Sequence, residues 1–162
     1  MKKWPIAIQV YTVDKEATAD FEGTVRALKA MGYDGVELCD TYGGTAVQLR
    51  KICDEVGLTI VGAHVNLNEI EDDAILSDYA ATGMKYIAIP WFHKPTDPAF
   101  LADNIEKFRV LGERMKSFGL QLGYHNHAHE FVVDGGEILM ETILRNTEPD
   151  VFAEFDVFWV AY

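Results

Sequence analysis

Short apolar runs alternate along this chain with longer segments in which apolar residues recur every three or four positions. The short runs have the length and composition of β-strands. They cover residues 6–11, 35–38, 58–65, 84–91, 120–127 and 151–159. The longer segments have the spacing of amphipathic helices. Their apolar faces are Phe21, Val25, Leu28 and Met31 in the first, Ala46, Leu49, Cys53 and Val56 in the second, and Leu101, Ile105, Phe108 and Met115 in a later one.

A glycine separates four of the helical segments from the strand that follows. These glycines are Gly32, Gly57, Gly83 and Gly119, at intervals of 25, 26 and 36 residues. Glycine suits the left-handed residue that ends many helices. The pattern therefore predicts a repeated helix–turn–strand unit, and strands joined by helical crossovers are parallel.

The helix that carries Leu101, Ile105, Phe108 and Met115 is expected to begin at Thr96-Asp97-Pro98, a capping residue followed by a proline suited to a first helical turn. Two further helices are expected. A less regular one follows Asn66, and a short one covers residues 137–146. We find no linker composition, so residues 1–162 are expected to form a single domain.

Both an open doubly wound sheet and a β/α barrel fit this alternation. The first strand is not followed by a Gly-x-Gly-x-x-Gly loop, which argues against a dinucleotide fold. Polar residues instead recur where strands end, and in a β/α barrel the active site gathers at those ends. We therefore predict an α/β protein of the TIM-barrel type with about six β/α units.

The strand-end residues are the candidates for chemistry. They are Gln9, Tyr11, Glu37, His64, His125, His127, Glu154 and Asp156. Strand alternation puts His125 and His127 on one face, and puts Glu154 and Asp156 on a face shared with Phe158. Imidazole and carboxylate ligands on neighbouring strands suit Mn²⁺, Zn²⁺, Co²⁺ or Mg²⁺. We predict His125 and Asp156 as metal ligands.

The remaining candidates are assigned to proton transfer or to substrate contact. Glu154, His127 and Glu37 are expected to be catalytic. The expected substrate contacts are Gln9, Tyr11, His64, Trp91, Asn126 and Trp159. For Trp91 and Trp159, stacking on a sugar face and ordinary packing are equally plausible. Buried ion pairing is the rival explanation for Glu154 and Glu37.

Composition limits the classes of binding partner that are expected. The net charge is −12 and the isoelectric point about 4.7, which disfavours binding to nucleic-acid phosphates. No apolar run approaches the roughly 20 residues needed to span a membrane, and the N-terminus lacks the apolar stretch of a signal peptide. Cys39 and Cys53 read as reduced thiols. A cytoplasmic protein is expected.

Four segments carry a family resemblance. They are Ile-Gln-Val-Tyr-Thr (8–12), Gly-Tyr-Asp-Gly-Val-Glu-Leu (32–38), Gly-Tyr-His-Asn-His-x-x-Glu-Phe (123–131) and Glu-Phe-Asp-Val-Phe-Trp-Val (154–160). Together they resemble the sugar phosphate isomerase/epimerase family, whose barrel is similar to that of xylose isomerase. The resemblance covers essentially the whole chain.

The resemblance implies a single divalent ion held by a Glu, an Asp, a His and a Glu from strands five to eight. Asp156 matches the family's Asp, and His125 stands where the family has the first Glu. The strand-seven and strand-eight ligands have no counterpart. A complete barrel needs about 250 residues, so strands seven and eight are expected to be missing. The chain is then a C-terminally truncated piece, a protein completed by a second copy that covers open barrel edges, or one that closes in another way.

The expected activity is metal-assisted isomerisation or epimerisation of a keto-sugar or its phosphate, with a small sugar as substrate. One alternative is a non-catalytic or partner-completed fragment that binds sugar. Others are an inositol-type dehydratase or lyase, and a metal-dependent phosphoesterase of the same barrel.

Overall fold

The computed structural model describes residues 4–91, 98–134 and 136–162. The chain divides into two compact units. Unit 1 comprises Met1–His64 and Asp73–Lys85, and unit 2 comprises Val65–Asp72 and Tyr86–Tyr162. Each unit is built on three parallel strands, and each is described here by itself.

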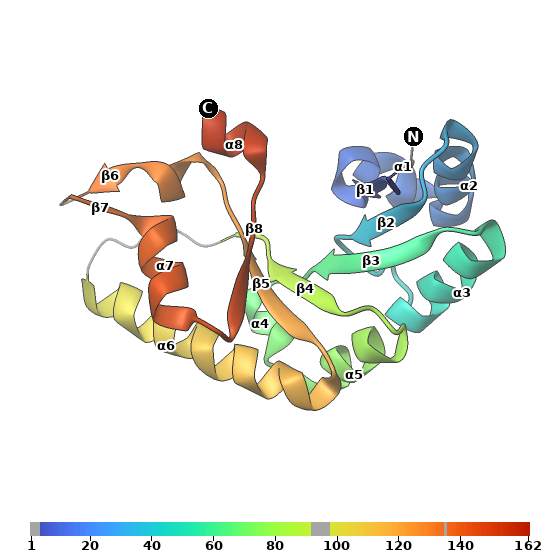
Figure 1. Cartoon of the computed structure of the whole chain (residues 1–162). Helices are drawn as coiled ribbons and strands as arrows, with labels where there is room; N and C mark the ends of the chain where they lie inside the picture. Colours follow the sequence, from blue (N-terminus) through green and yellow to red (C-terminus); the bar gives the residue numbers. More distant parts are fainter. Residues whose placement is uncertain (1–3, 92–97, 135) are drawn as a thin grey trace. The chain divides into compact units, whose positions relative to one another are not determined.

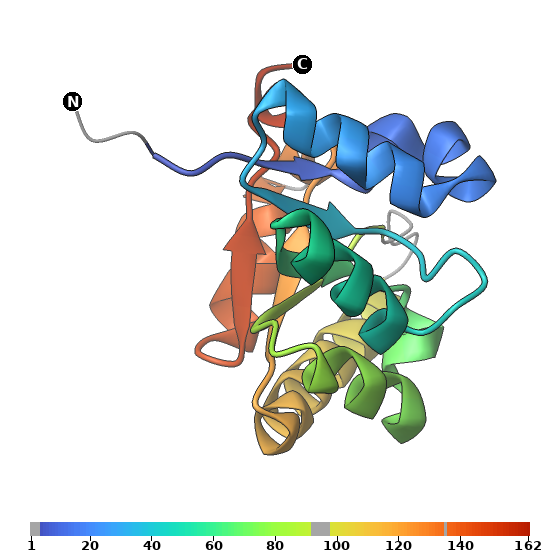
Figure 2. The same ribbon diagram turned by 90° about the vertical axis from the view of Figure 1, so that its right-hand side faces the viewer.

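Unit 1 contains the strands β1 (Ala7–Gln9), β2 (Gly35–Leu38) and β3 (Thr59–His64). β2 pairs with both others in parallel, and Gln9 lies beside Glu37 in the register. The helical elements are η1 (Val10–Val13), α1 (Asp14–Ala19), α2 (Phe21–Met31), α3 (Ala46–Val56) and α5 (Asp73–Ala81). Figure 2 shows α1 and α2 side by side, and they are in contact.

The core of unit 1 follows from the apolar faces. Val25 and Leu28 of α2, Leu49 and Cys53 of α3 and Val36 of β2 are almost completely buried. The helices α2 and α3 begin at polar caps, Asp20 and Thr45. In α3, for example, the Thr45 side chain accepts from the Gln48 backbone N–H at 3.2 Å, while Gln48 Oε1 accepts from the Thr45 N–H at 2.9 Å.

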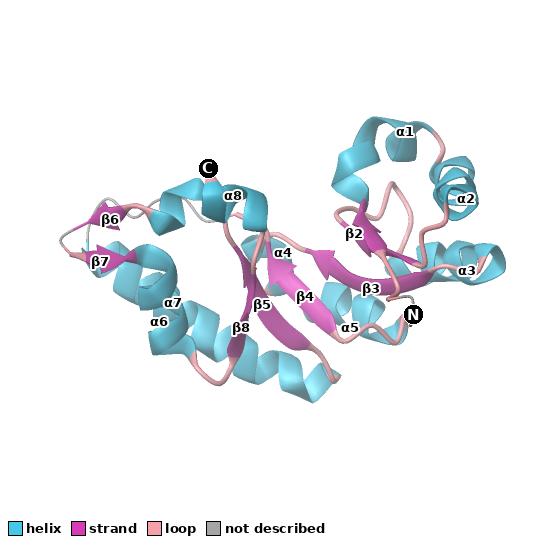
Figure 3. Ribbon diagram, turned by 45° about the horizontal axis from the view of Figure 1, so that its top comes forward, coloured by secondary structure: helices cyan, strands magenta, loops and turns pink. Residues whose placement is uncertain are grey.

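Unit 2 contains three parallel strands side by side, β4 (Tyr86–Ile89), β5 (Gln121–His125) and β8 (Val151–Glu154), with β5 in the middle (Figure 3). The other elements are α4 (Leu67–Ile70), α6 (Pro98–Met115), η2 (Lys116–Phe118), η3 (Ala128–Phe131), α7 (Leu139–Thr147) and α8 (Val157–Ala161). A short antiparallel pair, β6 (Val133–Asp134) and β7 (Glu137–Ile138), precedes α7 (Figure 1).

α6 is the long helix that covers β5 and β8. Phe108 packs on Tyr124 of β5 with ring centroids 5.8 Å apart, and both side chains are fully buried. Gly112 lets the helix approach the segment before β8, because a Cβ there would lie 2.5 Å from the Asp150 carbonyl oxygen. α7 contributes Met140 and Ile143 to the same core.

The predicted alternation of strands and helices is confirmed. Gly32, Gly57, Gly83 and Gly119 all have positive φ, between 72° and 101°, as their place after helices requires. The segment after Asn66 forms two helices, α4 and α5, rather than one. Thr96 and Asp97 of the predicted helix start lie outside the described residues.

Three local predictions are wrong. The last strand ends at Glu154, and residues 157–161 form α8, because Asp156 caps a helix there. Residues 10–13 form a 3₁₀ helix instead of continuing the first strand. Met31, the last residue of α2, is 74% exposed and does not join the buried face of the helix.

Candidate functional site

In unit 1, three predicted site residues meet at the ends of neighbouring strands. Glu37 Oε2 accepts a hydrogen bond from Gln9 Nε2 at 2.9 Å, and His64 Nε2 lies 3.6 Å from the same oxygen. The side chains of His64 and Glu37 are 9% and 21% exposed. A half-buried carboxylate beside an imidazole can hold a proton or bind a sugar hydroxyl.

Gln9 uses both ends of its amide. Besides donating to Glu37, it accepts from the Tyr11 backbone N–H at 3.0 Å and so caps η1. The Tyr11 side chain is 73% exposed. Substrate contact by these two residues stays a prediction.

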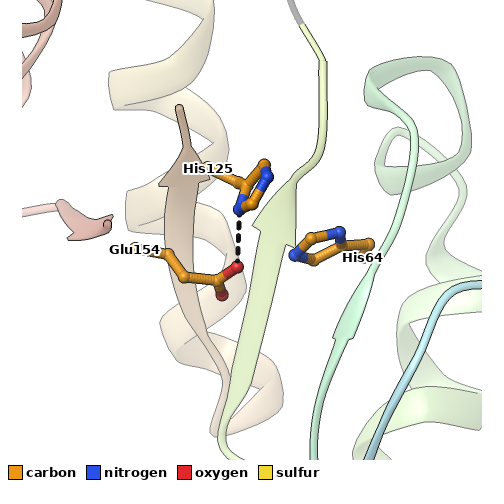
Figure 4. Close-up of side chains that lie close together, drawn as sticks. All are labelled: His64, His125 and Glu154. Carbon is orange, nitrogen blue, oxygen red and sulfur yellow. Dashed lines mark hydrogen bonds and ion pairs between the residues drawn. The ribbon is translucent and has the colours of Figure 1, made fainter. Parts of the chain in front are cut away.

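In unit 2, His125 and Glu154 face each other across the pair β5–β8. They are register partners, and His125 Nδ1 lies 3.0 Å from Glu154 Oε1 (Figure 4). Their side chains are 14% and 27% exposed. Both are strand-end positions, which is why the alternation along each strand identified them. The third side chain labelled in Figure 4, His64, belongs to unit 1.

Asp156 follows β8 and caps the N-terminus of α8. Its Oδ1 accepts from the backbone N–H groups of Phe158 at 2.9 Å and Trp159 at 3.5 Å. The predicted face shared with Phe158 does not exist, since Phe158 lies on a helix and is 61% exposed. Both capping bonds use Oδ1, so Oδ2 is the oxygen that Asp156 can offer to a ligand.

Asn126 is fully buried and fastens the end of β5 to the end of β8. Its Oδ1 accepts from the Asp156 N–H at 2.9 Å, and its Nδ2 donates to the Asp156 carbonyl oxygen at 3.2 Å. This reciprocal pair fixes the backbone of Asp156. Its predicted contact with substrate stays a prediction.

His127 lies in a cluster of aromatic and imidazole rings. Its ring centroid is 4.6 Å from that of Trp91, 5.4 Å from Trp159 and 5.1 Å from His125. Burial lowers the pKa of His127 below its ordinary value, and the neighbouring His125 acts in the same direction. His129 stacks against the same ring at 6.2 Å. Trp91 and Trp159 thus line the surroundings of an imidazole, consistent with either packing or stacking on a sugar.

Glu130 was not among the predicted site residues. Its side chain is completely buried, yet it accepts from Tyr124 Oη and from the His127 N–H, both at 2.7 Å. His129 Nε2 lies 3.1 Å from Glu130 Oε1. Burial of the Tyr124 side chain raises the pKa of its hydroxyl, and the neighbouring Glu130 carboxylate raises it further. The sequence shows Glu130 in a His-x-x-Glu segment, but only the fold shows that its side chain is buried.

The donor set of unit 2 fits a divalent metal ion. His125 and Glu154 bring an imidazole nitrogen and a carboxylate oxygen close together. The Asp156 carboxylate is not part of that group, so its role as a metal ligand stays a prediction. Nitrogen and oxygen donors of this kind suit Mn²⁺, Co²⁺, Zn²⁺ or Mg²⁺. An imidazole whose second nitrogen is bonded to a carboxylate is also the usual arrangement of a metal-binding histidine.

The parallel β/α arrangement is that of xylose isomerase-like TIM barrels, as comparison with solved structures shows. Two similar structures are sugar phosphate isomerases/epimerases from Parabacteroides distasonis. One is 24% identical with a TM-score of 0.85, over 98% of this chain and 71% of the other. The second is 23% identical with a TM-score of 0.81, over 99% of this chain and 68% of the other.

An L-ribulose 3-epimerase is also similar, with 13% identity and a TM-score of 0.68 over 98% of this chain and 62% of that chain. At these identities the similarity establishes the fold. No protein-family model matches the chain. No curated protein sequence matches it either. The predicted resemblance to sugar phosphate isomerases/epimerases is thereby confirmed at the level of the fold.

Among the described residues, no helix is both long and apolar enough to cross a membrane.

Proposed function

We propose that this chain catalyses isomerisation or epimerisation of a keto-sugar by metal-assisted proton transfer. The observation that carries the proposal is the His125–Glu154 pair, 3.0 Å apart at the ends of two adjacent parallel strands. Strand ends of this kind form the active face of β/α barrels. Similar solved structures include a D-psicose 3-epimerase in the presence of D-fructose and a Mycobacterium smegmatis xylose isomerase-like barrel protein in complex with magnesium.

The residues of unit 2 divide into holding and transferring groups. His125 and Asp156 would hold the ion, which supplies a Lewis acid that polarises a sugar carbonyl. Glu154, which pairs with His125, would move the proton on the adjacent carbon, and His127 would donate a hydrogen bond or a proton to the sugar oxygen. In unit 1, Glu37 pairs with an amide and an imidazole, and its predicted role in proton transfer stays a prediction.

The experiment compares two substitutions of Asp156. Asp156→Asn keeps an oxygen that can cap α8 but removes the carboxylate, whereas Asp156→Ala removes both. We expect Asn to weaken binding of Mn²⁺ or Co²⁺ at least tenfold, measured by calorimetry, while the melting temperature stays close to that of the wild type. Ala should weaken binding and lower the melting temperature as well.

A matched control is Glu113→Gln, because Glu113 is an exposed carboxylate on α6 that lies 3.8 Å from Arg109. It should leave metal binding unchanged.

Turnover is followed with D-fructose as the probe sugar, by loss of the label from a deuterated carbon next to the carbonyl. Unchanged metal affinity in Asp156→Asn, or metal binding without any proton exchange on a panel of ketoses, would contradict the proposal.

A further inference from the structure

His125 and His127 are two residues apart, and their rings meet edge to face with centroids 5.1 Å apart. Each ring has one nitrogen whose surroundings dictate where the proton of the neutral imidazole sits. For a neutral imidazole, one nitrogen donates and the other accepts, so fixing one fixes the other.

The Nδ1 of His125 faces a carboxylate oxygen, Glu154 Oε1, at 3.0 Å. A carboxylate accepts hydrogen bonds, so Nδ1 carries the proton and the ring lone pair is on Nε2. Register pairing of the two residues on adjacent strands keeps this contact in place. His125 therefore presents an acceptor nitrogen.

The Nδ1 of His127 has the opposite surroundings. His127 and Glu130 form a capping box, in which the His127 N–H donates to Glu130 Oε2 at 2.7 Å and the Glu130 N–H faces the His127 side chain. The contact to Nδ1 is loose, because this buried atom has no partner in full hydrogen-bond geometry among the described residues. A proton on Nδ1 would put two donors face to face, since the Glu130 backbone N–H faces this side chain.

The buried carboxylate of Glu130 makes that capping box rigid. It also accepts from Tyr124 Oη at 2.7 Å, and neither Glu130 nor Tyr124 is accessible. The Glu130 backbone N–H therefore cannot turn away from the imidazole. The remaining nitrogen of His127, Nε2, has no hydrogen bond to any residue that the structure describes.

We propose that His125 and His127 are locked in opposite tautomers, with the proton of His125 on Nδ1 and the proton of His127 on Nε2. His127 is then a hydrogen-bond donor to an anionic or carbonyl oxygen and neither a metal ligand nor a proton acceptor. Given the proposed function, on which this part rests, that oxygen is the carbonyl or an adjacent hydroxyl of the keto-sugar. The tautomers themselves follow from the contacts alone.

Long-range ¹H–¹⁵N correlation spectra of the ¹⁵N-histidine-labelled full chain test the tautomers. They are recorded at about pH 8.5, roughly two units above the ordinary imidazole pKa, without metal or sugar. Single His→Gln variants assign the signals. We expect the Nδ1–H pattern for His125 and the Nε2–H pattern for His127. The same tautomer in both rings, or an Nδ1–H pattern for His127, would overturn the proposal.

A substitution of Glu154 tests whether this carboxylate determines the tautomer of His125. Glu154→Ala removes the acceptor of His125, so its signal should move toward the Nε2–H pattern while that of His127 stays in place. Glu113→Ala, on the exposed face of α6, should change neither. A Glu154→Ala variant in which His125 keeps the Nδ1–H pattern would show that Glu154 does not hold the tautomer and would refute the proposed lock.

The donor role has its own measurement. With a ketose that the wild-type chain epimerises, His127→Asn keeps an N–H donor and should lose about tenfold in kcat, whereas His127→Phe should lose about a hundredfold or more. Equal loss in both variants would refute the donor role. Absence of turnover in the wild type contradicts the proposed function instead, and the spectra still decide the tautomers.

Discussion

Buried polar side chains fix the strand ends of unit 2. Asn126 and Glu130 are both inaccessible, and both use their polar atoms on the backbone or side chains of residues next to the candidate site. A buried polar group is tolerated only when it is hydrogen-bonded. These two residues therefore shape the site through their hydrogen bonds to its neighbouring residues.

The first prediction concerns Glu130. Replacing it with Ala leaves Tyr124 Oη and the His127 N–H buried without an acceptor, so the free energy of unfolding should fall by about 2–4 kcal/mol. Urea unfolding followed by circular dichroism measures this change. Glu113→Ala should cost less than about 0.5 kcal/mol, as for other exposed ion pairs. Equal effects of the two substitutions would show that the buried network adds no stability.

The second prediction concerns Cys53, which is completely buried in unit 1. Burial raises the pKa of its thiol from 9.0 to about 11. Because the thiolate is the reactive form, its fraction at pH 8 falls roughly a hundredfold. Native protein should therefore react with iodoacetamide at Cys53 far more slowly than urea-unfolded protein, as measured by peptide mass spectrometry. Fast labelling of Cys53 in the native state would contradict the buried position.

At the residue scale, the sequence predicted site residues at strand ends better than a residue whose burial depends on packing between distant segments. His125 and Glu154 were predictable, because alternation along a strand and the strand's end suffice to locate them. Glu130 was not, since its burial depends on α6 packing Phe108 against Tyr124, a contact between distant residues. The pairing of His125 with Glu154 rather than Asp156 also required the register of β5 and β8.

Elements were predictable where local signals agree with tertiary packing. The four glycines after helices mark the turns correctly, because a left-handed residue is a local requirement. Residues 155–159 were assigned to a strand because Phe, Val and Trp favour strands. The Asp156 cap and the following backbone N–H groups form α8 instead. The hairpin β6–β7 has no alternation of apolar and polar residues, so no sequence pattern predicted it.

The third prediction tests the close approach of α6 to the segment before β8. At an open helical position, Gly→Ala stabilises a protein by about 1 kcal/mol through helix propensity. At Gly112 the new Cβ would lie 2.5 Å from the Asp150 carbonyl oxygen. Gly112→Ala should therefore destabilise by about 1–3 kcal/mol through overpacking. A raised unfolding midpoint in urea would contradict this contact between helix and backbone.

At the scale of the whole molecule, a strongly acidic charge coexists with exposed apolar side chains. The net charge is −12. In unit 2, Val157 is 76% exposed, Phe158 61% and Tyr162 85%, and the last two stack on each other at 5.7 Å. In the described part of unit 2, β8 pairs with β5 alone. Apolar side chains beside an unpaired strand edge favour association with another chain.

The fourth prediction is that the chain self-associates through the exposed apolar side chains of Val157, Phe158 and Tyr162, and that salt strengthens the association. Copies that each carry −12 repel one another, and added salt screens that repulsion. The weight-average mass from light scattering should therefore rise with protein concentration and rise further between low and high ionic strength. Phe158→Glu removes apolar area and adds repulsion, so it should raise the dissociation constant about tenfold or more. Met31→Glu, at an exposed apolar site on α2 of unit 1, should leave the dissociation constant within about twofold, apart from the added charge. A monomer at every concentration and salt level would contradict self-association. Equal effects of both substitutions would show that Phe158 lies outside the interface between copies.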